Sequence, residues 1–134
     1  MSAEEILGVV RRVFEAGKEG DIETFRKLHS THYTRFSDLP PYRIQERDEA
    51  VKLKGSLYSE LVDFTYQMSD IEVKVLGDVA VVTFLLKYGG VYVYGYTFEG
   101  RPLSITSRCT VVLARENGEW RIIHEHYSRI PEQE

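Results

Sequence analysis

The sequence has few of the residues that would crosslink it, hold it in a membrane or send it out of the cell. Its one cysteine, Cys109, leaves no partner for a disulfide within the chain, which favours a reducing compartment. The longest apolar stretch, Val79 to Leu86, contains Thr83 and is far shorter than a membrane-spanning helix. The first residues include Glu4 and Glu5 and lack the apolar core of a signal peptide. We therefore expect a cytoplasmic protein without a membrane partner.

An excess of positive charge is also missing. The net charge is −4, and the nearest approach to a basic cluster is the pair Arg11-Arg12, which lies in a segment rich in acidic residues. Nucleic acids attract basic surfaces, so this pattern argues against a nucleic-acid partner. With 134 residues, of which 43% are hydrophobic, the composition is that of an ordinary globular protein. We expect a single domain over residues 1–134.

The N-terminal part is patterned for helices. Ser2-Ala-Glu-Glu5 forms a capping box, and apolar residues then recur at helical spacing to about Gly17. Asp21 is placed to cap a second, short helix. The apolar face of that helix consists of Ile22, Phe25 and Leu28.

A short strand and a third helix are expected next. Tyr33–Phe36 has a strand pattern, and the turn-forming residues Asp38–Pro41 end it. The third helix is expected from about Asp48 to Leu61. Its apolar side consists of Ala50, Leu53, Leu57 and Leu61.

From Ile71 onward the apolar residues follow the two-residue period of strands. The expected strands are Ile71–Val75, Val79–Tyr96, Leu103–Arg115 and Trp120–Ile130, joined by turns at Gly77-Asp78, Glu99-Gly100 and Asn117-Gly118. Gly89-Gly90 predicts a bulge or bend in the long second strand. Helices followed by an antiparallel meander predict an α+β fold, with three N-terminal helices packed on a strongly curved antiparallel β-sheet.

Three segments, residues 20–38, 77–84 and 108–128, resemble the SnoaL-like branch of the nuclear-transport-factor-2-like superfamily. The third is similar to the association (hub) domain of calcium/calmodulin-dependent kinase II, which has the same Thr-x-Val, a DG-type turn, a Trp and His-x-His-x-Ser. The resemblance implies a cone-shaped fold that encloses a pocket. It implies no single reaction, because the superfamily includes isomerases, dehydratases, polyketide cyclases, transport factors and oligomerisation hubs.

The chain differs from the kinase hub at the positions that line the hub's pocket. The hub arginines that line its pocket match Leu86, Val111 and Tyr127, and a hub tyrosine matches Phe25. The resemblance then implies an apolar cup, with Tyr42 either covering it as a lid or packing on the surface. Such a cup disfavours a small carboxylate, because a buried anion needs a cation or donors. The expected lining residues are Phe25, Phe36, Tyr42, Leu86, Val111, Ile123, Glu125 and Tyr127.

Strict alternation divides the last strand between two faces. One face carries Trp120, Ile122, His124, His126 and Ser128, and the other carries Ile123, Glu125 and Tyr127. Hydropathy alone directs the tryptophan face inward. The resemblance implies the opposite, since polyketide cyclases have an acid/base aspartate near the position of Glu125, and we adopt that orientation.

The candidate chemistry is limited to a few residues. His124 and His126 lack an obvious third ligand, so no metal and no cofactor is expected. Glu125 would be a general base if burial raised its pKa, with Tyr127 as a hydrogen-bond donor. Otherwise Glu125 would form an ion pair with a neighbour such as Arg108.

Three functions follow from this pattern. The first is a homodimeric module that binds a small apolar or aromatic molecule. The second is an isomerase, dehydratase or cyclase with Glu125 and Tyr127 as catalytic residues, and the third is an oligomerisation or interaction domain. A homodimer through the sheet is expected because both faces are apolar, while three helices can cover only one. The paired positions that show this are Ile122 with Ile123 and Val111 with Val112.

Overall fold

The computed structural model describes residues 2–93 and 100–131. Along the chain the elements are α1 (Ser2–Glu19), α2 (Ile22–Lys27), β1 (His29–Phe36), β2 (Gln45–Glu46), α3 (Arg47–Glu60), β3 (Val62–Leu76), β4 (Val79–Val93), β5 (Gly100–Glu116) and β6 (Glu119–Arg129). The three predicted helices and the later strands are confirmed, whereas β2 was not predicted and β3 begins well before Ile71. Tyr96 and Glu99, at the predicted end of β4 and the turn after it, lie outside the described residues.

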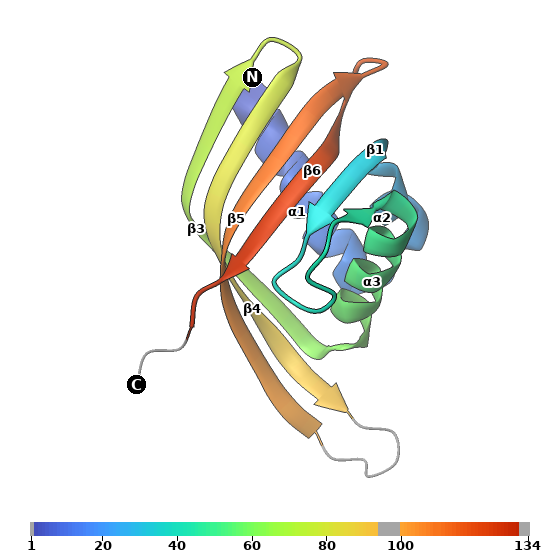
Figure 1. The fold of residues 1–134 in the computed structure, drawn as a ribbon, viewed down its shortest axis with the longest axis vertical. Helices are drawn as coiled ribbons and strands as arrows, with labels where there is room; N and C mark the ends of the chain where they lie inside the picture. Colours follow the sequence, from blue (N-terminus) through green and yellow to red (C-terminus); the bar gives the residue numbers. More distant parts are fainter. Residues whose placement is uncertain (1, 94–99, 132–134) are drawn as a thin grey trace.

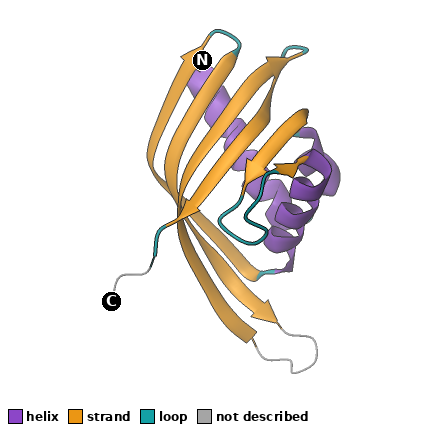
Figure 2. Ribbon diagram, viewed as in Figure 1, coloured by secondary structure: helices purple, strands orange, loops and turns teal. Residues whose placement is uncertain are grey.

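The strands form one six-stranded sheet in the order β2-β1-β6-β5-β4-β3. β1 and β6 pair in parallel, and the other neighbours pair antiparallel. α1 crosses behind the sheet, while α2 and α3 lie beside β1 (Figure 1). Figure 2 shows the helices gathered on one side of the strands. The expected α+β architecture is therefore confirmed. In the described part of the chain, no helix is long and apolar enough to cross a membrane.

Gly89 and Gly90 allow β4 to approach both of its neighbours, β5 and β3, closely. A Cβ atom on Gly89 would stand 2.1 Å from the carbonyl oxygen of Leu103, and one on Gly90 would stand 2.8 Å from that of Val62. Only glycine permits such close backbone approach from both neighbouring strands. The pairing of β4 with β5 continues through this point, while the register with β3 shifts between Val62 and Thr65.

The last strand contains a β-bulge that reverses its alternation. In the register with β5, Val112 pairs with His124 and Leu113 pairs with Ile122, so Ile123 is an extra residue. Ile122 therefore points inward before the bulge and Glu125 points inward after it; both are buried. Before the bulge the tryptophan face points inward, as hydropathy predicted. After the bulge the Glu125 face points inward, as the family resemblance implied. The assumption of strict alternation along the whole strand was wrong.

The interior face of α3 also differs from the prediction. The buried residues of this helix are Ala50, Lys54 and Tyr58, while Leu53 is 42% exposed. These three positions are spaced four residues apart and therefore share one side of the helix. The same kind of correction applies to α2, where Phe25 is buried but Ile22 is 73% exposed. Because α3 buries this side and not the predicted leucine side, the ammonium group of Lys54 lies in the protein interior.

Candidate functional site

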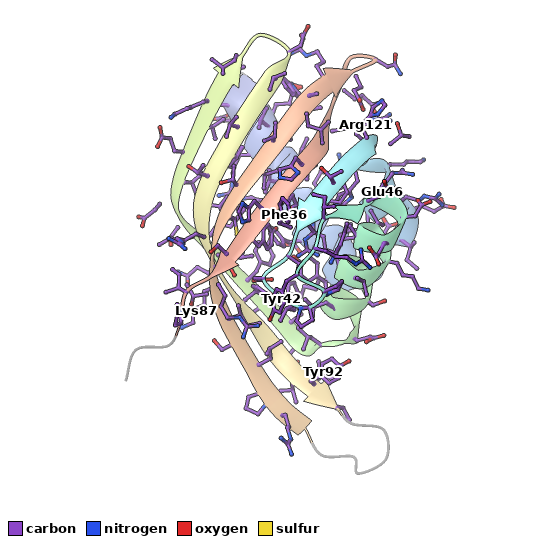
Figure 3. All side chains as sticks on the ribbon, in the orientation of Figure 1. Phe36, Tyr42, Glu46, Lys87, Tyr92 and Arg121 are labelled. Carbon is purple, nitrogen blue, oxygen red and sulfur yellow. The ribbon has the colours of Figure 1, made fainter. Side chains whose placement is uncertain are left out.

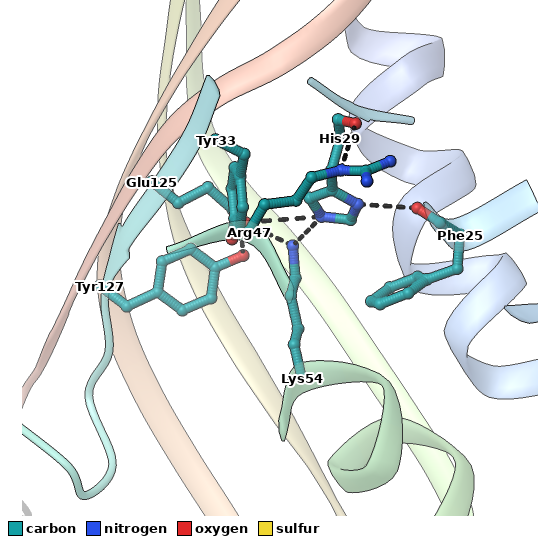
Figure 4. Close-up of polar contacts among 7 residues, drawn as sticks. All are labelled: Phe25, His29, Tyr33, Arg47, Lys54, Glu125 and Tyr127. Atoms are coloured by element: carbon teal, nitrogen blue, oxygen red, sulfur yellow. Dashed lines mark hydrogen bonds and ion pairs between the residues drawn. The ribbon is translucent and has the colours of Figure 1, made fainter. Parts of the chain in front are cut away.

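Six polar side chains meet in the interior between α3, β1 and β6. We refer to them as the interior cluster, which consists of His29, Tyr33, Arg35, Lys54, Glu125 and Tyr127. None is more than 3% exposed. β1 contributes the first three, α3 contributes the lysine, and β6 contributes the last two from just after the bulge. Figure 4 shows four of them, His29, Tyr33, Lys54 and Tyr127, around the Glu125 carboxylate.

Glu125 is the centre of this cluster. Its Oε1 atom accepts hydrogen bonds from the Lys54 ammonium and from the Tyr33 hydroxyl, and its Oε2 atom accepts one from the Tyr127 hydroxyl at 2.8 Å. The ion pair with Lys54 joins two side chains that are 0% and 2% exposed. A carboxylate with a cation and two hydroxyl donors is well compensated for the loss of water.

This environment keeps both members of the pair charged at neutral pH. Burial by itself raises the pKa of Glu125, but Lys54 and Arg35 outweigh it and bring this pKa down to about 2. Burial lowers the pKa of Lys54 to about 8, although Glu125 opposes that change. The raised pKa that a general base requires is therefore not found at Glu125.

His29 is held as a neutral imidazole. Its Nδ1 atom lies 2.7 Å from the carbonyl oxygen of Phe25, which can only accept, so Nδ1 carries the proton. Its Nε2 atom then accepts a hydrogen bond from the Lys54 ammonium at 3.1 Å. Burial lowers the pKa of His29 to about 3, with the charge of Lys54 acting in the same direction.

A second buried carboxylate closes the same interior from the loop after β1. Asp38 is 4% exposed and accepts hydrogen bonds from the hydroxyl groups of Ser107 and Tyr88, the latter at 3.1 and 3.3 Å from its two oxygens. Asp38 was expected only to form a turn, and these hydrogen bonds also join its loop to the sheet.

Five of the eight predicted lining residues lie in this interior: Phe25, Leu86, Val111, Glu125 and Tyr127. The structure does not bring the other three to them. Ile123 is half-buried at the bulge, and Phe36 and Tyr42 are 40% and 73% exposed (Figure 3). The Phe36 ring instead lies against the imidazoles of His124 and His126, on the face of the sheet away from the helices.

The other candidate residues are also placed by the structure. Arg108 donates a hydrogen bond to Ser128 and does not pair with Glu125, whose partner is Lys54. Among the residues described, no three potential ligands are grouped as a metal site would require. Cys109 is a free cysteine and is buried, and burial raises the pKa of its thiol.

Four members of the cluster, His29, Tyr33, Arg35 and Lys54, were not found from the sequence. Lys54 lies four residues after Ala50 and four before Tyr58, and this spacing was the one available sign that it faces inward. Arg35 follows Tyr33 at the two-residue spacing of a strand, whereas His29 lies before an irregularity of β1, in a part of the strand that was not predicted.

An open groove of about 530 Å³ lies between the three helices, on the other side of Phe25. The Phe25 ring forms part of its wall, and a Cβ atom on Gly55 would stand 3.3 Å from this ring. The centroid of this ring lies 5.6 Å from the Lys54 ammonium, and the ring packs edge-on against His29. One aromatic side chain therefore separates the groove from the interior cluster.

The family described as SnoaL-like domain matches residues 6–133 of this sequence. The chain belongs to the SnoaL-like family. No curated protein matches it.

Solved structures similar to this SnoaL-like chain include two proteins with different descriptions. One is a candidate dehydratase of the NTF2-like family from Streptomyces avermitilis, with 19% identity, 96% of each chain covered and a TM-score of 0.79. Another is the calcium/calmodulin-dependent kinase II hub of S. rosetta, with 21% identity, 96% of each chain covered and a TM-score of 0.76. At these identities the likeness establishes the fold.

His29 gives a first test of this geometry. Its pKa is about 3 in the folded protein and about 6.5 when unfolded, so the unfolded chain binds more protons between these values and stability falls as the pH falls through them. We expect His29→Gln to flatten the dependence of the unfolding free energy on pH between pH 6 and 5, by up to about 1.4 kcal/mol per pH unit. Chemical denaturation at several pH values measures this slope.

The matched control is His32→Gln, at an exposed histidine of β1. It should leave the slope close to that of the natural protein. An unchanged slope in His29→Gln would show that this imidazole is protonated in the folded state.

Proposed function

We propose that this SnoaL-like domain binds a small molecule with an apolar body in the interior beneath its sheet, and that it acts as a homodimer. The observation that carries the proposal is the interior cluster. Buried ion pairs are often less stabilising than well-packed apolar residues of the same volume. A cluster of six polar side chains in this position is accounted for if a ligand uses it.

Binding is favoured over catalysis by the state of Glu125. With a pKa of about 2 it is a weak base, and both of its oxygens already accept hydrogen bonds. An isomerase, dehydratase or cyclase remains the second candidate because of Lys54, whose pKa of about 8 is close to the range of acid–base catalysts. The description of the S. avermitilis neighbour as a candidate dehydratase agrees with this alternative.

The helix groove supports a route for the ligand. Its volume of about 530 Å³ is in the range of small-molecule sites. Rotation of the Phe25 ring would connect this groove to Lys54 and His29. An apolar molecule would then lie between the helices with its polar end toward the cluster, and burial of its apolar surface would supply most of the binding free energy.

Location and domain organisation belong to the same proposal. The free thiol of Cys109 is consistent with a reducing compartment, and we propose the cytoplasm. The family match over residues 6–133 agrees with a single domain over the whole chain.

The dimer is proposed through the face of the sheet that the helices leave uncovered. This face presents apolar and uncharged side chains that are partly exposed, including Val81, Leu85, Thr110, Val112 and Phe36. A second copy of the chain would bury these residues against their own equivalents around a twofold axis. Similar folds described as kinase hub domains occur in S. rosetta and C. elegans, the latter as an association domain with a TM-score of 0.70.

Ligand binding is tested with Tyr127→Phe, which removes one hydroxyl and keeps the ring. We expect the molecules that stabilise the natural protein in a thermal-shift screen to bind about 5- to 10-fold more weakly to the variant. The reason is that the ligand loses its hydrogen bond with the Tyr127 hydroxyl. Titration calorimetry measures the affinity. Tyr66→Phe is the control, since the Tyr66 hydroxyl contacts Glu15 at the surface. Equal affinities in both variants would place the ligand elsewhere.

The dimer is tested with Thr110→Arg, which places a charge near the centre of the uncovered face. Thr110 pairs with Thr83 on one side and His126 on the other. We expect light scattering to give the mass of a dimer for the natural protein at micromolar concentration and that of a monomer for the variant, because like charges would face each other. Leu53→Arg, on the exposed side of α3, should remain dimeric. A monomeric natural protein would contradict the proposal.

A further inference from the structure

Arg35 is the one charged member of the interior cluster that makes no close ion pair or hydrogen bond within the described residues, although its charge acts on Glu125 from farther away. It is 3% exposed, and its Nε atom is enclosed without a hydrogen-bond partner. Within the described part of the chain, its guanidinium donates no hydrogen bond and no carboxylate lies within ion-pair distance. Its close contact is the Tyr127 ring, whose centroid is 5.0 Å from Cζ.

The two nearby carboxylates are engaged elsewhere. Glu125 accepts hydrogen bonds from Lys54, Tyr33 and Tyr127. Asp38 accepts them from side chains of the sheet. An arginine cannot lose its proton in a protein, and buried N–H donors without an acceptor cost free energy. Arg35 therefore remains a cation with an unfilled set of donors.

We propose that Arg35 anchors the ligand of this domain and that the ligand carries a carboxylate. This inference rests on the proposed function and narrows it to a class of ligand. A guanidinium presents a planar fork of N–H donors that matches the two oxygens of a carboxylate. The aromatic ring of Tyr127 on one side of this fork suits an apolar or aromatic body next to the anionic group.

The expectation of a neutral ligand is thereby revised for a physical reason. It was based on Leu86, Val111 and Tyr127, which stand where the kinase hub has arginines. The structure supplies a cation from β1 instead, at a position outside that comparison. An anion in this interior would be compensated by Arg35, with the further positive charge of Lys54 near it.

The experiment compares sodium butyrate, benzoate and phenylacetate with the corresponding amides, by thermal shift and titration calorimetry. We expect the carboxylates to raise the melting temperature of the natural protein and the amides to do so far less. Arg35→Met should weaken carboxylate binding at least about 10-fold, because a charge-assisted pair is lost. Arg12→Met, at an exposed arginine of α1, is the matched control and should bind like the natural protein.

The stability of ligand-free Arg35→Met is a second readout. Because the variant removes buried N–H donors that have no acceptor and keeps similar bulk, its melting temperature should rise by about 3 °C or more. A fall would show that Arg35 holds the fold together and would overturn the inference. The inference would also be overturned if only the amides bound, and if their binding were weakened in Tyr127→Phe but not in Arg35→Met. That result would still agree with the proposed function. Absence of binding by every probe would count against both.

Discussion

The ion pair between Lys54 and Glu125 is the interaction on which the rest of this interior depends. It joins α3 to β6 across a separation of 71 residues, with both side chains almost fully buried. The bulge at Ile123 directs Glu125 inward, and the buried face of α3 directs Lys54 toward it. Because the ammonium donates to His29 as well, the helix, the first strand and the last strand are fixed by one charge.

The same pair explains why this fold does not form a purely apolar cup. Apolar residues such as Leu86 and Val111 are fully buried, but they share the interior with two cations and two carboxylates. The hydroxyl groups of three tyrosines and one serine, together with the Lys54 ammonium, donate to the oxygens of both carboxylates. Arg35 is left as the charged group whose N–H donors have no acceptor. Chemical selectivity of the domain would then arise from electrostatics as well as from shape.

The sequence predicted the elements better than their orientation. The three helices, the cap at Asp21 and the turn at Asn117-Gly118 follow from local patterns, and all are found. Burial of Lys54 could not be predicted, because a lysine on a helix is normally exposed and its partner is distant in the chain. The bulge at Ile123 arises from pairing with β5, and nothing in the strand's own residues marks it. The burial of Arg35 could not be predicted for the same reason, because it depends on the pairing of β1 with β6.

The most direct test is a double-mutant cycle on Lys54 and Glu125, measured by chemical denaturation with Lys54→Met, Glu125→Met and the double variant. If the pair is a buried ion pair retained for its role in the interior, each single variant should lose about 3–5 kcal/mol by leaving one charge uncompensated, and the double variant should lie within about 1 kcal/mol of the natural protein or above it. A double variant destabilised by the sum of the two single losses would contradict the account, because the two charges would then act independently.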